Sequence, residues 1–333
     1  MKRAQARPRE KRWVVRAGDG TTVADILRRA GEGLSAIEEG RVFVGRVRVG
    51  DAGAAVRAGD EVRIGGADGA RSGTGTGTGT GTAVGEWAVI WERDGLLACS
   101  KPAGIPTVAD HVGASHALVA LAAASVGRKG SDLLVTSRLD REVSGVVVFA
   151  LNAEAEARLR TAREQGRYAR RYVALATDTL MKVDQGDQGI QVWDAPIGAG
   201  KDPRHRAAFG PDAKASQTRW TVIARAGGFA MLAVEPQTGR THQIRVHASH
   251  AGAPLLGDRD YGGATRVTLP DGRVVALARI ALHAARVTVP DARGGPLVAT
   301  APIPGELARA WAALGGASEA WDRAVSCELE TSP

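Results

Sequence analysis

Apolar and polar positions follow different patterns in two blocks of the chain, which are separated by a segment with almost no apolar residues. The first block covers residues 13–65. Its pattern predicts a helix starting at 22–27 after Thr21 or Thr22, a short helix at 34–39, a hairpin at 42–49 that turns at Gly45, and a strand at 61–64. This order predicts a small α+β module.

The second block covers residues 87–315 and mixes strands with helices. A helix that is capped by Asn152 and ends near Gly166 is expected, because an asparagine side chain satisfies unpaired N–H groups at a helix start. Strands are predicted at 87–91, 96–100, 145–151, 171–176, 229–235 and 286–290. Because strands and helices do not alternate strictly, the pattern favours an α+β fold with a mixed, largely antiparallel sheet and flanking helices.

The segment between the blocks, residues 66–86, contains five consecutive Gly-Thr pairs from Gly73 to Thr82. It offers little apolar surface to bury, and repeated glycine makes a strand entropically costly, so we expect a flexible tether. After the second block, residues 316–333 are expected to form a loose tail. The chain is thus predicted to consist of a small module, a linker, a large domain and a tail.

The composition indicates a class of partner. The 333 residues carry a net charge of +8 with a pI of about 10.0, which suits a polyanion such as nucleic acid. No run of about 20 apolar residues occurs, so no membrane span is expected. Cys99 and Cys327 have neither metal-ligand nor redox spacing, and no apolar stretch follows the basic N-terminus as a secretory signal requires. We therefore expect a cytoplasmic protein.

Three stretches carry candidate chemistry, and the first contains the sequence RLDRE. Asp140 lies between Arg138 and Arg141 and just before an apolar strand, so its carboxylate is expected at the edge of the core, in preorganised surroundings. Taken alone, an aspartate between two arginines is more typical of a salt-bridged surface turn. In the second stretch, ARRYVALA, Tyr172 is either a residue that stacks on a base or an ordinary strand residue.

The third stretch, TGRTHQIRVHASHAG, predicts a turn and then a short helix that is capped by Thr241 and ends at Gly252. His242, His247 and His250 lie on this helix. Their offsets of five and three residues do not match the four-residue histidine pair of zincin helices, and no cysteine lies nearby. We therefore expect no metal. The chain also lacks a phosphate loop and a dinucleotide fingerprint, so no cofactor is expected.

Taken together, the stretches point to a family. SKPAGIPT, RLDREVSGVVVFA, ARRYVALA, PQTGRTHQIRVHASHAGAPLLGDRDYGG and LHAARVTVP occur in the order found in the RluA family of RNA pseudouridine synthases. The resemblance covers residues 87–314 and implies the pseudouridine synthase fold, with the substrate in a central cleft. The first block resembles the small RNA-binding domain named after ribosomal protein S-four, although Glu38 and Glu39 stand where that family usually has basic residues.

The resemblance assigns roles residue by residue. Asp140 matches the catalytic aspartate, Tyr172 the tyrosine that packs against the target base, and Arg245 the arginine that pairs with the catalytic carboxylate. Arg138 matches the residue that helps to fill the gap left by a flipped nucleotide. Ser137 departs from the family, which usually has histidine there. Three further residues are expected to bind substrate: Arg141, Arg240 and His242.

A carboxylate suits the implied reaction. Converting uridine to pseudouridine breaks the bond from ribose to uracil nitrogen and remakes it to a ring carbon, with no net change in atoms, so an isomerase needs no cofactor here. The carboxylate either attacks the anomeric carbon, as in retaining glycosidases, or removes a ribose proton to give a glycal. The sequence leaves both routes open.

Three other functions compete with this interpretation. They are an RNA-binding or chaperone protein of the same fold without catalysis, a nucleoside- or sugar-cleaving hydrolase that uses Asp140, and a metal-dependent enzyme built on the three histidines. We expect RNA as the partner, with ribosomal RNA ahead of transfer RNA, no association with membranes, and a monomeric protein.

Overall fold

The computed structural model describes residues 11–38, 42–44, 47–49, 52–64, 87–109, 117–179 and 189–329. It divides the chain into two units, 1–80 and 81–333. The predicted linker at 66–86 lies outside the described residues. Within the described ranges, no helix combines the length and the apolar character needed to cross a membrane.

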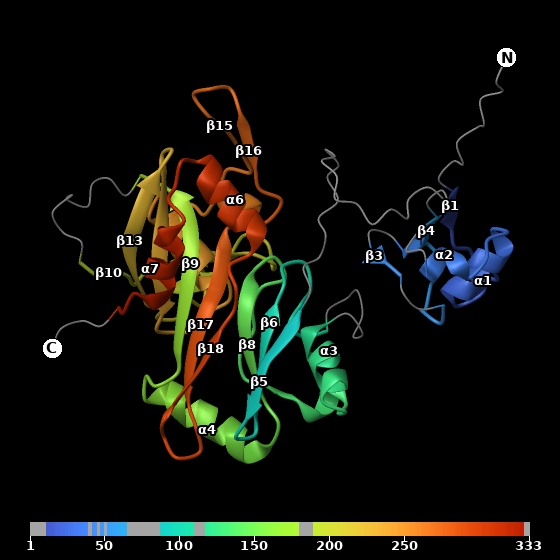
Figure 1. The fold of residues 1–333 in the computed structure, drawn as a ribbon, viewed down its shortest axis with the longest axis horizontal. Helices are drawn as coiled ribbons and strands as arrows, with labels where there is room; N and C mark the ends of the chain where they lie inside the picture. Colours follow the sequence, from blue (N-terminus) through green and yellow to red (C-terminus); the bar gives the residue numbers. More distant parts are fainter. Residues whose placement is uncertain are drawn as a thin grey trace. The chain divides into compact units, whose positions relative to one another are not determined.

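The N-terminal unit is a four-stranded antiparallel sheet with two short helices (Figure 1). Its elements are β1 (Lys11–Val14), α1 (Val23–Arg29), α2 (Ser35–Glu38), β2 (Val42–Val44), β3 (Val47–Arg48) and β4 (Glu61–Ile64), and the strand order is β1-β4-β2-β3. Helix α1 starts after Thr22, whose hydroxyl accepts from the Asp25 N–H while the Asp25 carboxylate accepts from the Thr22 N–H. The predicted helix start and the antiparallel pairing of β2 with β3 are confirmed, the predicted turn at Gly45 lies outside the described residues, and β1 was not predicted.

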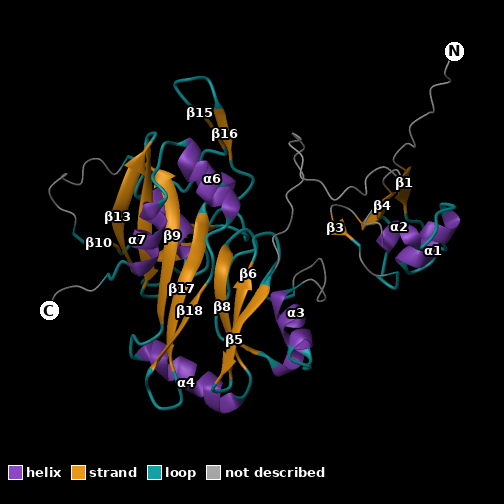
Figure 2. Cartoon of the chain, viewed as in Figure 1, coloured by secondary structure: helices purple, strands orange, loops and turns teal. Residues whose placement is uncertain are grey.

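The second unit is built on one large sheet, whose long strands dominate the view in Figure 2. Its strand order is β10-β13-β14-β9-β17-β8-β6-β5, with β18 beside β17 and β7 beside β8. Among these described strands only the contact between β8 and β17 is parallel. The predicted mixed, largely antiparallel sheet is confirmed. The strands are β5 (Ala88–Arg93), β6 (Leu96–Lys101), β7 (Leu134–Val135), β8 (Ser144–Ala150), β9 (Ala169–Thr177), β10 (Gln191–Trp193), β13 (Thr218–Ala226), β14 (Phe229–Pro236), β17 (Leu282–Pro290) and β18 (Pro296–Thr300).

Two small hairpins and several helices complete this unit. The hairpins pair β11 (Ile197–Ala199) with β12 (Arg206–Ala208), and β15 (Arg266–Thr268) with β16 (Val274–Ala276). The helices are α3 (Leu118–Ser125), α4 (Ala153–Glu164), α5 (Gln243–His250), α6 (Gly305–Ala313) and α7 (Glu319–Ser326), with 3-10 turns η2 (Gly130–Asp132) and η4 (Arg259–Tyr261).

Helix α4 forms where the sequence predicts it. The Asn152 side chain accepts a hydrogen bond from the Ala155 N–H at 2.8 Å, which satisfies one of the unpaired donors at the helix start. The helix then buries Leu159 and Ala162 in a cluster with Val148 of β8, and it lies across one end of the long strands (Figure 1).

The predicted loose tail from residue 316 is wrong. Residues 319–326 form α7, which buries Trp321 and Ala324 in a core cluster with Trp311 of α6 and Leu175 of β9. The charged residues between these positions face outward, so the segment is amphipathic, and its apolar side closes one face of the sheet.

The centre of the sheet sets the position of the functional loop. At the start of β8, Gly145 has a φ of +125°, and a Cβ there would lie 2.2 Å from the carbonyl oxygen of Ala284 in β17. Only glycine allows the two strands to approach this closely. The irregular loop 136–143 enters β8 at this point, beside the middle strands β9 and β17.

Candidate active site

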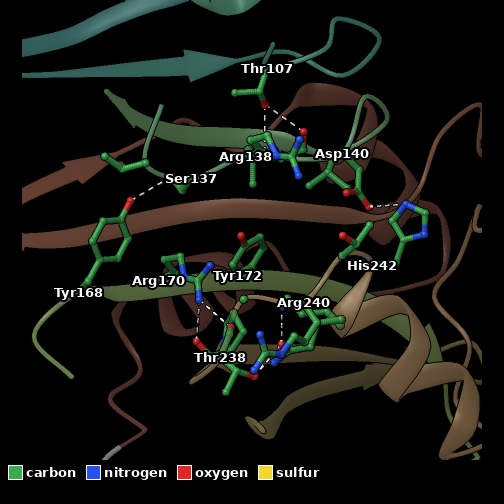
Figure 3. Close-up of a pocket in the computed structure, with 18 of the residues that line it drawn as sticks. Thr107, Ser137, Arg138, Asp140, Tyr168, Arg170, Tyr172, Thr238, Arg240 and His242 are labelled. Carbon is green, nitrogen blue, oxygen red and sulfur yellow. Dashed lines mark hydrogen bonds and ion pairs between the residues drawn. The ribbon is translucent and has the colours of Figure 1, made fainter. Parts of the chain in front are cut away.

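A cleft of about 1040 Å³ lies over the middle of the sheet (Figure 3). It is lined by the loop before β8, by the start of β9 and by the turn that leads from β14 into α5. All seven site residues predicted from the sequence line it: Arg138, Asp140, Arg141, Tyr172, Arg240, His242 and Arg245. Three segments that are far apart in the sequence therefore meet at one place, and the roles of these residues remain predictions.

Arg245 lines the cleft and contacts three carboxylates. The residue is 4% exposed, and its guanidinium donates from Nη1 to Asp140 Oδ2 at 3.2 Å. It also donates from Nε and Nη2 to the two oxygens of Asp258, each at 2.8 Å, and from Nη2 to Asp260 Oδ2 at 2.8 Å. Burial opposes the charge of Arg245, but the hydrogen bonds and negative charge of Asp258, together with Asp140, outweigh burial and raise the pKa of the guanidinium.

The loop that carries Asp140 has no regular structure, and two buried side chains hold its backbone. The Thr107 hydroxyl donates to the Leu139 carbonyl at 2.9 Å and accepts from the Leu139 N–H at 3.0 Å. Lys101 Nζ donates to three carbonyl oxygens, those of Pro102, Ile105 and Arg141, at 2.8–3.2 Å. The two residues that flank Asp140 are thereby fixed to the segment 101–107, which also restrains the position of the Asp140 Cα.

Lys101 is 1% exposed. Burial lowers the pKa of its ammonium to about 7, and the positive charge of Arg279 lowers it further, while Asp140 acts in the opposite direction. A lysine with this pKa changes its charge within the physiological range, directly beneath the Asp140 loop.

The turn into α5 differs from the prediction that Thr241 caps this helix. The N-cap residue is His242, whose backbone adopts a left-handed conformation with φ of 57°, and its side chain makes no capping bond. The buried Gln243 instead closes the turn, because its Oε1 accepts from the Thr238 hydroxyl at 2.7 Å and from the Arg240 N–H at 3.0 Å. The predicted cap is therefore wrong, and the left-handed residue turns the imidazole of His242 toward Asp140 (Figure 3).

His242 lies between a carboxylate and a phenol. Its Nε2 is 3.8 Å from Asp140 Oδ2, and its Nδ1 is 2.8 Å from the hydroxyl of Tyr261. Burial lowers the pKa of His242, an effect that the charge of Asp140 partly offsets and that of Arg245 reinforces. The imidazole is therefore neutral at physiological pH.

Aromatic and basic side chains from β9, the end of α4 and the loop before β8 also line the cleft. Tyr172 on β9 is 7% exposed, and burial raises the pKa of its phenol, so the side chain offers a neutral ring to the cleft. The Tyr168 hydroxyl lies 3.1 Å from the Ser137 hydroxyl, and the Arg163 guanidinium covers the Tyr168 ring at 4.5 Å. Arg138 is exposed, and its guanidinium has no polar partner within the described part of the chain.

Arginines outnumber acids around the cleft. The lining includes Arg138, Arg141, Arg163, Arg170, Arg240 and Arg245, against Asp140, Glu164 and Glu235. Arg240 donates from Nε and Nη2 to the Ala215 carbonyl at 3.2 Å, and this fixes the side chain at the rim without neutralising its charge. A cleft with this charge balance suits the phosphate backbone of a nucleic acid.

Comparison with known proteins decides the family. A family model described as RNA pseudouridylate synthase matches residues 95–250. An RNA pseudouridine synthase of Bacillus subtilis is 32% identical over 228 residues, which cover 67% of this chain and 70% of the relative. The ribosomal large subunit pseudouridine synthase D of Xanthomonas campestris is 32% identical over 243 residues, 68% and 69% of the two chains. The chain belongs to the RNA pseudouridylate synthase family.

Solved structures agree on the fold. The human RNA pseudouridylate synthase domain containing 4 aligns with a TM-score of 0.52 at 20% identity, covering 68% of this chain and 92% of that one. The human protein named domain containing 1 gives 0.50 at 21% identity, covering 67% and 85%. The predicted fold class and enzyme class are confirmed, as is membership of the RNA pseudouridine synthases: this chain is an RNA pseudouridine synthase and thus an isomerase.

Several residues of this synthase that shape the cleft had no role assigned from the sequence. They are Lys101, Thr107, Asp258, Asp260 and Tyr261. A signal was present, because the first two stand in SKPAGIPT and the other three in GDRDYGG, both of which belong to the stretches that carry the family resemblance. Their contacts, however, depend on the fold.

The histidines proposed for a metal-dependent rival are engaged differently in this synthase. His247 uses both ring nitrogens, Nδ1 with the Thr218 hydroxyl and Nε2 with the Ala195 carbonyl, each at 2.9 Å. The His250 ring packs edge-on against Phe209 at 5.6 Å. Within the described ranges, no group of three or more histidine, cysteine, aspartate or glutamate side chains is arranged to hold a metal ion.

Proposed function

We propose that this synthase converts specific uridines of ribosomal RNA to pseudouridine, with Asp140 as the catalytic carboxylate. The observation that carries the proposal is the position of Asp140, which lies in a basic cleft with one oxygen bound by the buried Arg245 and with Tyr172 in the same cleft. Relatives named ribosomal large subunit pseudouridine synthase D support ribosomal RNA as the substrate. Transfer RNA is the second candidate.

The two carboxylate oxygens of Asp140 have different roles in this proposal. Because Arg245 binds Oδ2, Oδ1 is left to face the ribose. In the nucleophilic route, Oδ1 forms a bond to C1′ while the C1′–N1 bond breaks and its electron pair leaves with the uracil. The uracil ring then turns so that C5 forms a bond to C1′, and the electron pair of the ester C–O bond returns to Asp140. In the glycal route, Asp140 takes a ribose proton and later returns it. Either way C5 loses a proton and N1 gains one.

The remaining residues act on the nucleotide. A uridine must leave its stack to reach Asp140, which costs a few kcal/mol. We assign Tyr172 to packing against the uracil ring and Arg138, whose guanidinium extends from the exposed part of the loop, to filling the gap in the RNA. Arg141, Arg240 and His242 are assigned to substrate contacts around the same cleft.

The N-terminal unit supports a smaller part of the proposal. Its two helices followed by an antiparallel hairpin and strand match the order expected of a domain similar to ribosomal protein S-four. We assign it an accessory role in RNA binding, although Arg28 and Arg29 of α1 already contact Asp25 and Asp19. A monomer in the cytoplasm remains our expectation.

Pseudouridine mapping tests the proposal directly. Total RNA from cells that lack this protein is mapped after complementation with wild type, Asp140→Asn or Asp271→Asn. Asp271 is an exposed residue paired with Arg273 on a hairpin, outside the cleft lining, and it controls for an Asp→Asn change as such.

We expect one or a few large-subunit ribosomal RNA sites to disappear, and wild type and Asp271→Asn to restore them while Asp140→Asn does not. Restoration by Asp140→Asn refutes the catalytic assignment and favours a non-catalytic RNA-binding protein. Sites confined to transfer RNA refute the substrate assignment alone, and free uracil released from RNA indicates a hydrolase.

A further inference from the structure

Tyr261 in η4 connects three parts of the site, although it does not itself line the cleft. Its hydroxyl oxygen accepts a hydrogen bond from the Arg206 backbone N–H at 2.9 Å and lies 2.8 Å from His242 Nδ1. The face of its ring lies 4.8 Å from the Arg245 guanidinium. One side chain therefore contacts both cleft residues whose polar atoms approach Asp140.

The direction of these hydrogen bonds follows from counting protons. A backbone N–H can only donate, so the Tyr261 oxygen serves as its acceptor and keeps its own proton for another partner. Among the described residues, the other hydrogen-bond partner of this hydroxyl is His242 Nδ1. Donation from the phenol to Nδ1 is the arrangement that gives the Tyr261 proton a partner among the described residues, and a neutral imidazole that accepts at Nδ1 carries its proton on Nε2.

The second end of the imidazole favours the same tautomer. Nε2 faces Asp140 Oδ2 at 3.8 Å, and a carboxylate oxygen favours an N–H donor over a lone pair. This distance is longer than a hydrogen bond, but catalytic contacts of this kind often shorten only when substrate is bound.

We propose that Tyr261 is a positioning residue, which fixes His242 in its Nε2–H tautomer so that His242 and Arg245 both donate to Oδ2 of Asp140 and leave Oδ1 as the reacting oxygen. The inference rests on the catalytic role of Asp140 proposed above. It adds that the neutral His242 orients the carboxylate, and that the GDRDYGG stretch serves the site by holding both donors.

The pH at which His242 becomes protonated depends on the charged and titratable groups around it and on the hydrogen bond from Tyr261. These groups are Asp140 on the loop before β8, Arg245 on α5, and Asp258, Asp260 and Tyr261 at η4. His205, which precedes β12, approaches both Asp260 and the Tyr261 ring. Protonating His242 places a proton on Nδ1 and breaks the bond donated by Tyr261. Removing this hydroxyl therefore makes His242 easier to protonate.

The first test reads the tautomer directly in the free enzyme. Long-range proton–nitrogen NMR spectra of histidine-labelled full-length protein distinguish the two neutral forms, and His242→Gln identifies the signal. We expect Nε2–H in wild type and a mixture in Tyr261→Phe, which keeps the ring over Arg245. Tyr168→Phe, which removes a different cleft hydroxyl, is the matched control and should leave this signal unchanged. An Nδ1–H form in wild type overturns the inference.

The second test measures catalysis. Release of tritium from transcripts of large-subunit ribosomal RNA labelled at uridine C5 reports the reaction, because C5 loses its hydrogen. In single-turnover assays we expect Tyr261→Phe to slow the rate about tenfold to a hundredfold with unchanged RNA affinity, the cost typical of a misplaced catalytic group. We also expect the acidic limb of the rate profile to move to higher pH. A wild-type rate and profile in Tyr261→Phe overturn the inference.

The two proposals fail in different ways. If wild type is active and Asp140→Asn is silent while Tyr261→Phe matches wild type, only the positioning role is wrong. If Asp140→Asn remains active, the catalytic role of Asp140 is wrong, whereas the NMR signal still decides whether Tyr261 sets the tautomer.

Discussion

The bond between Arg245 and Asp258 should contribute more to stability than any other ion pair around the cleft, and Asp258→Asn tests this. Asp258 is fully buried and accepts two of the four hydrogen bonds that Arg245 donates to carboxylates. The substitution removes the negative charge and turns an amide N–H toward a guanidinium N–H. Asp140 and Asp260 remain, but their side chains are 28% and 50% exposed, so water already screens them.

Breaking a buried pair from one side costs about 3–5 kcal/mol, since the partner charge remains buried. Because two carboxylates still contact Arg245 in Asp258→Asn, we expect a loss near the lower end of this range, about 3 kcal/mol. For a unit of this size, that loss lowers Tm by roughly 6–12 °C.

Thermal or urea unfolding followed by tryptophan fluorescence reports this unit, because six of the seven tryptophans lie after residue 80. The exposed pair between Asp271 and Arg273 supplies the control, and Asp271→Asn should leave the transition where it is in wild type. A loss below about 1 kcal/mol in Asp258→Asn would show that solvent or the neighbouring carboxylates compensate the buried guanidinium, and the reasoning would be refuted.

Two further predictions concern pH. Burial lowers the pKa of Lys101 from its ordinary 10.5 to about 7, so the free energy of unfolding rises as pH rises from about 7 to 10.5 and falls again as pH is lowered. The difference in free energy of unfolding between wild type and Lys101→Met, measured by urea titration, should change over this pH range. Burial also lowers the pKa of His283 from 6.5 to about 3, so stability is present above 6.5 and lost as pH falls toward 3. His283→Gln should flatten that acidic decline, and an unchanged slope would contradict the assignment.

The elements that were predicted correctly are those with local signals. The helix after Asn152 and the helix after Thr22 both start at a side-chain cap, which depends only on neighbouring residues. Helix α7 was missed because its eight residues are too few to be stable alone, and it forms by burying Trp321 in a core contributed by distant strands. Strand β1 was missed for a similar reason, because three of its four residues are exposed and its pairing with β4 defines it.

The site was predicted through resemblance and not through pattern. Asp140 and Arg245 are 105 residues apart, and nothing in the local sequence around either one indicates that their side chains meet. The same holds for Lys101, whose three acceptors include a carbonyl 40 residues away. Such contacts follow from strand order and register in the sheet, which a single sequence does not supply.

The structure explains why so many polar side chains of this synthase are buried around one irregular loop. A catalytic carboxylate must be held within a fraction of an ångström of its working position, and a loop without regular hydrogen bonds does not provide this by itself. Thr107 and Lys101 hold the backbone on either side of Asp140, while Arg245 holds its side chain and is itself held by Asp258. The bonds from Thr107 and Lys101 satisfy backbone groups that a strand or helix would otherwise have paired. If Asp140 has the catalytic role proposed above, these supports hold the carboxylate while the loop stays accessible to a nucleotide, and substitutions at them should affect the rate of reaction before they affect RNA binding.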